Sequence, residues 1–107
     1  MARTKFQTLT EQMFYTLLCL KDECCGTDIL DRVRAMTQGR VNIGSGTLYT
    51  LLEQFLDEDM IRQTKVEGRR RSYILTEKGM EMLRAERNRL EKQLADYRRI
   101  FEKEESP

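Results

Sequence analysis

Hydrophobic residues at helical spacing predict two helices in the first third of the chain. The first covers residues 8–24, where Thr8 opens a capping-box sequence and Gly26 is expected to end the helix. A second, shorter repeat of apolar positions predicts a helix from about Asp28 to Met36, with Thr27 as its N-cap.

A third helix is predicted after a short extended segment at residues 40–46. It begins with Ser45 as a candidate cap and runs to about Asp59. Its apolar residues fall at i, i+3, i+4, i+7 and i+8, which places them on one continuous face. These residues are Leu48, Leu51, Leu52, Phe55 and Leu56.

Two alternating segments then predict a β-hairpin. Residues Ile61–Val66 and Arg71–Leu75 both read as strands, and Glu67-Gly68 provides the turn between them. An isolated hairpin is marginal in water, so this one is expected to pack against the helices.

The last predicted helix starts after a Thr76 cap and extends to about Lys103. It carries a heptad stripe with one polar interruption, and the stripe is longer than a small three-helix core can cover. We expect part of it to bury against a second copy in a two-fold homodimer, and intrachain packing alone is the alternative. The candidate interface residues are Leu83, Arg87, Leu90, Leu94, Tyr97 and Phe101.

This order of elements predicts a mainly α fold with a small β-hairpin (α+β), a winged helix-turn-helix with a long C-terminal dimerisation helix. Residues 1–78 form the predicted DNA-binding region and residues 79–107 the dimerisation helix, together in one compact domain.

Composition limits the chemistry. The 107 residues include no histidine and three cysteines, and the net charge is +1. We therefore expect no metal site, no cofactor and no enzymatic activity, and we expect the cysteines to be reduced thiols, with redox sensing by Cys24 or Cys25 left open. The chain has no signal peptide and no apolar run long enough for a membrane span, so a soluble, cytoplasmic protein is expected.

The basic residues gather on the predicted hairpin, beside the predicted recognition helix. Such a cluster fits a clamp on DNA phosphates, while the start of the helix offers small or planar hydrogen-bonding groups to the bases. The candidate DNA-binding residues are Ser45, Thr47, Tyr49, Thr50, Lys65, Arg69, Arg70, Arg71 and Tyr73.

Two other interpretations stay open. A charge run is often only solvated surface, and we favour the clamp because close like charges repel unless an anion binds them. Strand alternation predicts that Arg70 lies on the opposite face from Arg69 and Arg71. A winged-helix protein-interaction module without DNA binding is the alternative function. Glu53 and the absence of basic residues on the third helix lend it slight support, and the arginine wing argues against it.

The sequence resembles the PadR family of transcriptional regulators. The resemblance covers about residues 8–85 and rests on Gly26-Thr27-Asp28-Ile29, on the Thr47-Leu48-Tyr49 element and on the segment from Arg69 to Gly79. It implies a dimeric regulator, usually a repressor, that binds an inverted-repeat operator. It also implies that the tyrosine of Thr-Leu-Tyr and the basic residues of the wing lie at the DNA.

The resemblance further implies release of DNA on binding a small aromatic or drug-like effector, or in response to stress. A pocket of stacked tryptophans is excluded because the chain has none. Several positions depart from the family pattern, among them Met60, which stands where a glycine is usual before the first wing strand. Thr27 stands where a tyrosine is common, and Ser45 stands where a proline often precedes Gly-Thr-Leu-Tyr.

Overall fold

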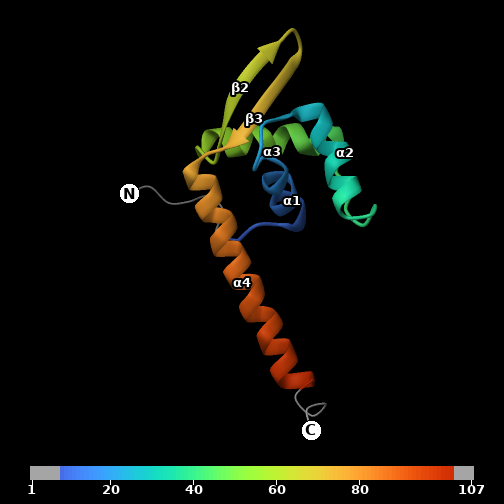
Figure 1. Ribbon diagram of the computed structural model, residues 1–107, viewed down its shortest axis with the longest axis vertical. Helices are drawn as coiled ribbons and strands as arrows, with labels where there is room; N and C mark the ends of the chain where they lie inside the picture. The colour runs from blue at the N-terminus through green and yellow to red at the C-terminus, as the bar shows by residue number, and fades with distance from the viewer. Residues whose placement is uncertain (1–7, 103–107) are drawn as a thin grey trace.

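A computed structural model describes residues 8–102 of the chain (Figure 1). Four helices and three short strands follow one another in the order of a winged helix, which confirms the predicted fold class. The elements are α1 (Glu11–Cys19), β1 (Cys24–Cys25), α2 (Gly26–Met36), α3 (Ser45–Asp57), β2 (Ile61–Glu67), β3 (Arg70–Leu75) and α4 (Glu77–Phe101).

The sheet has three antiparallel strands in the order β1-β3-β2. β2 and β3 form the predicted hairpin, with Ile61 opposite Leu75 and Glu67 opposite Arg70. Gly68 has a φ of +63° at the turn, a left-handed conformation that glycine adopts without strain. β1 pairs with the other edge of β3, so the wing is tied to the helices at its base.

The first helix is shorter than predicted. Its N-cap is Thr10 instead of Thr8: the Thr10 hydroxyl accepts from the Met13 amide, and the Met13 sulfur accepts from the Thr10 amide. The helix ends at Cys19, because residues 24 and 25 leave the helical path to pair with β3.

Two further boundaries also differ from the prediction. Gly26 begins α2 instead of ending α1, and Cys25 is the N-cap in place of Thr27. Gly44 is the N-cap of α3, so Ser45 is its first helical residue, and the helix ends at Asp57. The predicted Thr76 cap of α4 is confirmed, because its hydroxyl accepts from the Gly79 amide at 3.1 Å. That helix ends at Phe101, and Lys103 lies outside the described residues.

The core lies between the three short helices and the base of the sheet. The predicted apolar face of α3 supplies its centre, since Leu48, Leu52 and Phe55 are almost completely buried. The segment before α3 also contributes Val41 and Ile43, although it forms no strand.

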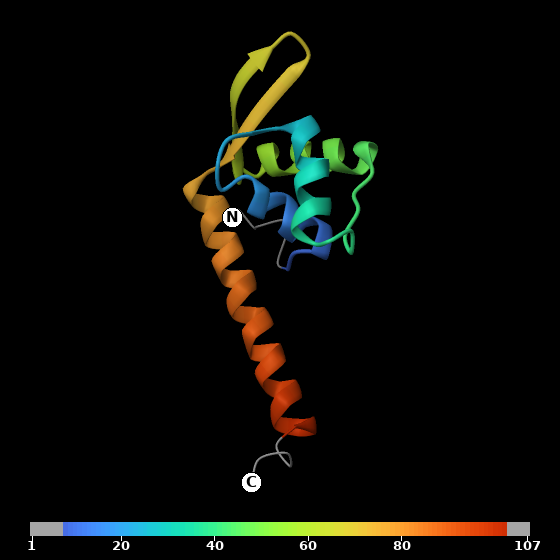
Figure 2. The ribbon, with the colours of Figure 1, turned by 45° about the vertical axis from the view of Figure 1, so that its right-hand side comes forward.

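Helix α4 leaves this core and extends away from it on the side opposite the wing (Figures 1 and 2). Its first half is anchored. Met82 and Leu83 pack on the core, and the Glu86 carboxylate, 4% exposed, accepts from the Leu9 amide and pairs with Arg89. Every described side chain after Leu90 on this helix is exposed.

Candidate nucleic-acid interface

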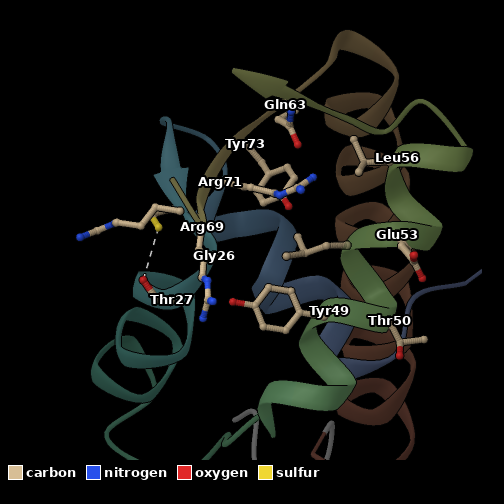
Figure 3. Close-up of a pocket in the computed structure, with 13 residues that line it drawn as sticks. Gly26, Thr27, Tyr49, Thr50, Glu53, Leu56, Gln63, Arg69, Arg71 and Tyr73 are labelled. Atoms are coloured by element: carbon tan, nitrogen blue, oxygen red, sulfur yellow. Dashed lines mark hydrogen bonds between the residues drawn. The ribbon is translucent and has the colours of Figure 1, made fainter. Parts of the chain in front are cut away.

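A cleft of about 420 Å³ lies between the start of α2, the outer face of α3 and the base of the wing. Figure 3 shows it with side chains entering from all three elements. Its lining includes Cys25, Tyr49, Glu53, Arg69, Arg70 and Arg71.

Helix α3 presents the predicted polar groups along its exposed side. Ser45, Thr47, Tyr49 and Thr50 are all exposed, and of these Tyr49 and Thr50 line the cleft. The Tyr49 ring crosses toward α2 (Figure 3), where a β-carbon on Gly26 would lie 3.5 Å from Tyr49 Cε1. The Tyr49 ring therefore lies within ordinary contact distance of the start of α2.

The three arginines of the wing differ in their partners. Arg70 lies 3.9 Å from the Asp28 carboxylate of α2, whereas the guanidinium groups of Arg69 and Arg71 make no ion pair or hydrogen bond within residues 8–102. All three line the cleft. Because Arg69 belongs to the turn and the strand begins at Arg70, the alternation argument applies only to Arg70 and Arg71.

The other two predicted wing residues occupy different environments. Lys65 is exposed on β2, outside the cleft. Tyr73 is only 5% exposed and forms part of the cleft wall (Figure 3). Burial raises the pKa of the Tyr73 phenol, so it stays a neutral hydrogen-bonding group.

The sequence left open whether Cys25 senses redox state, and it did not indicate that Cys25 lies in this cleft. Its sulfur lies 3.3 Å from the Thr27 hydroxyl, and this hydrogen bond, followed by the nearby Arg70, lowers the pKa of the Cys25 thiol. Burial instead raises the pKa of Cys19 to about 11. All three cysteines are free thiols. The sequence did not indicate that Cys25 is the N-cap of α2, because the pairing of β1 with β3 makes that helix begin earlier than predicted.

The candidate dimer residues lie on the free part of α4 and at its base. Leu90, Leu94, Tyr97 and Phe101 are 42%, 48%, 54% and 71% exposed, and the last two rings are 5.3 Å apart. Leu83 packs on its own core. Arg87 pairs with Glu91 of the same helix at 3.3 Å and lines a groove between α1 and α4.

Two features are absent from residues 8–102. This part of the chain holds no group of three or more cysteine or acidic residues placed to bind a metal ion. None of its helices is both long and apolar enough to cross a membrane.

Comparison with known proteins matches both the sequence and the fold. A model of the family described as the transcriptional regulator PadR-like family matches residues 16–85. A search of curated proteins finds no match.

Solved structures share the fold at low sequence identity. A transcriptional regulator from Clostridium thermocellum has a TM-score of 0.72 and 18% identity, over 86% of this chain and 93% of that chain. A PadR family regulator from Eggerthella lenta has a TM-score of 0.71 and 17% identity, over 86% and 82% of the two chains. ZitR, a zinc-responsive MarR family member from Lactococcus lactis, has a TM-score of 0.61 and 18% identity, over 98% and 72%.

Proposed function

Because this chain belongs to the PadR-like family of transcriptional regulators, we propose that it is a repressor that binds an inverted-repeat operator as a homodimer. Each subunit places the start of α3 in the major groove and the wing against the backbone of double-stranded DNA. The family is one of regulators, which agrees with a protein that is not an enzyme.

The observation that supports DNA binding is the lack, in the described part of the chain, of carboxylate partners for the side chains of Arg69 and Arg71. Of the five arginines of α4, those at positions 87, 89, 98 and 99 have carboxylate partners, and Arg84 has none among the described residues. The two on the wing have none within residues 8–102, although they line a cleft beside α3. Unpaired guanidinium groups held close together are well suited to bind phosphate, because an anion removes their mutual repulsion.

The test is the salt dependence of DNA binding. Replacing Arg69 and Arg71 with alanine should weaken binding to every duplex and reduce the slope of log K against log salt by about two. Replacing Arg98 and Arg99, on the far part of α4, removes the same charge and serves as the matched control. An unchanged slope in the wing variant would refute the phosphate clamp.

The proposed homodimer rests on the exposed apolar stripe of α4. Leu90, Leu94, Tyr97 and Phe101 recur at heptad spacing, and exposed apolar residues in such a row gain from burial against a second copy. Leu94→Glu should dissociate the dimer in analytical ultracentrifugation and weaken operator binding. A wild-type monomer at micromolar concentration would contradict this part of the proposal.

An effector site is proposed in the groove between α1 and α4. It measures about 360 Å³ and is lined by Phe14, Leu18, Leu83, Arg84 and Arg87, so it offers an apolar floor with cationic edges. A small aromatic molecule bound there would act on both the core and the dimer helix. A screen for ligands that raise the melting temperature and release DNA tests this step.

The same binding assay separates this function from the alternative. At low salt the attraction between basic side chains and DNA phosphates is strongest. A correctly folded protein that binds no duplex under that condition would favour the protein-interaction module.

A further inference from the structure

Among residues 8–102, Glu53 is the one acidic side chain that lines the same cleft as the three arginines. It is exposed, and it forms no ion pair with any residue in the described part of the chain, Arg69 and Arg71 included. In Figure 3 it projects from α3 on the same side as Thr50, away from the Tyr49 ring.

Glu53 extends a polar row along α3. Gly46, Thr50 and Glu53 follow at i, i+4 and i+7, so they lie above one another on one face. The Thr50 hydroxyl donates to the Gly46 carbonyl at 3.1 Å, and a β-carbon on Gly46 would meet nothing within 4 Å. The first turns of this face are therefore small and open, and Glu53 is its first long, charged side chain.

A carboxylate at this position cannot face the DNA backbone, because two negative charges repel and a phosphate offers no hydrogen-bond donor. The donors in the major groove are the amino groups of cytosine N4 and adenine N6. Adenine places its N7 acceptor beside that amino group, which repels the second carboxylate oxygen, whereas the cytosine edge carries no acceptor of its own.

We infer that Glu53 determines base specificity by accepting a hydrogen bond from a cytosine amino group in each operator half-site. This inference rests on the proposed function and adds one feature to it. The arginines position the protein without choosing a sequence, and Glu53 opposes binding wherever no donor faces it.

The experiment is selection of binding sites from a pool of randomised duplexes, performed with the full chain and three variants. For the wild type we expect one position in each half-site at which cytosine is enriched about fivefold to tenfold over the other bases. Glu53→Gln keeps the shape and adds a donor, so the preference at that position should move toward adenine, which glutamine reads through N6 and N7. Glu53→Ala should bind all four bases there about equally.

Asp57→Asn is the matched control. Asp57 is an exposed carboxylate at the end of the same helix and does not line the cleft, so its removal changes the net charge equally. The control should keep the cytosine preference, although the loss of one negative charge raises the affinity of all three variants for any duplex.

The outcomes separate the two proposals. A wild-type protein that enriches a defined site, with the same base preferences after Glu53→Gln and Glu53→Ala, would overturn the role of Glu53 and leave the repressor proposal intact. A wild-type protein that enriches no sequence would overturn both.

Discussion

Gly79 is the position at which the structure makes its sharpest energetic prediction. It is buried in the first turn of α4, directly against the residue that precedes the wing. A β-carbon there would lie 2.1 Å from the Met60 carbonyl oxygen and 2.8 Å from Leu75 Cδ2. Ordinary contact needs about 3.5 Å, so α4 or the Met60 backbone would have to move by more than about 1 Å.

Gly79→Ala should therefore destabilise the protein. Alanine gains up to about 1 kcal/mol of helix propensity. Overpacking costs about 1–3 kcal/mol, and the upper part of that range applies because the obstacle is backbone that cannot change rotamer. The Met60 carbonyl also accepts from the Thr76 amide at 3.0 Å, so moving it strains that hydrogen bond. We expect a net loss of about 1–2 kcal/mol, and each kcal/mol lowers the melting temperature of a domain this size by about 4–8 °C.

Thermal unfolding followed by circular dichroism measures this effect, and Gly46→Ala provides the control. Gly46 is also a helical glycine, but its surroundings are open, so alanine there should leave the stability unchanged or raise it by at most about 1 kcal/mol. If Gly79→Ala melts at or above the wild-type temperature, α4 does not pack against the Met60 backbone as closely as described.

Three further predictions concern ionisable groups. Hydrogen bonding to Arg89 lowers the pKa of the buried Glu86, so its carboxylate stabilises the fold above the ordinary glutamate pKa, and this stability is lost as the pH falls through the folded value. Glu86→Gln should lower the urea midpoint of unfolding at neutral pH, and the midpoint of this variant should fall less than that of the wild type as the pH is lowered. Urea midpoints that fall in parallel with pH for the two proteins would count against this. At pH 8, iodoacetamide should label Cys25 before Cys19, because only Cys25 has a lowered thiol pKa and lines the cleft; equal labelling in peptide mass spectra would disprove the difference. Arg70→Ala should cost less than about 1 kcal/mol in the same urea assay, since both members of its ion pair are more than half exposed, and a larger loss would mean that Arg70 holds the wing in place.

Local patterns were enough to predict the elements whose signals lie within a few residues. The apolar face of α3, the hairpin and the Thr76 cap each depend on spacing or on one side chain, and the structure contains all three. The wing arginines were also identifiable as a group, because they are consecutive in the chain.

The strand β1 could not be predicted, because its partner is far away in the sequence. Cys24 pairs with Tyr73, and two residues carry no alternation to mark a strand. This missing strand explains the wrong end of α1 and the wrong cap of α2. The capping box at Thr10 was missed for another reason, since a methionine sulfur replaces the usual glutamate or glutamine.

The cleft itself depends on the same distant pairing. Glu53 and Arg70 come from separate elements, and the sequence does not say whether they pair with each other. The structure pairs Arg70 with Asp28 and leaves Glu53 exposed, and this difference carries the inference about base choice.

The projecting α4 helix has a mechanical consequence. It is fixed at one end, where Gly79 meets Met60 and Glu86 meets the Leu9 amide, and its 25 residues make a rod of about 37 Å. The part beyond Glu86 is about 22 Å long, so a tilt of about 5° there moves the far end by about 2 Å. In a dimer joined along these rods, a small change in the packing of α4 against α1 would be amplified into a change in the distance between the two wings. That distance sets the spacing of operator half-sites that the dimer can span.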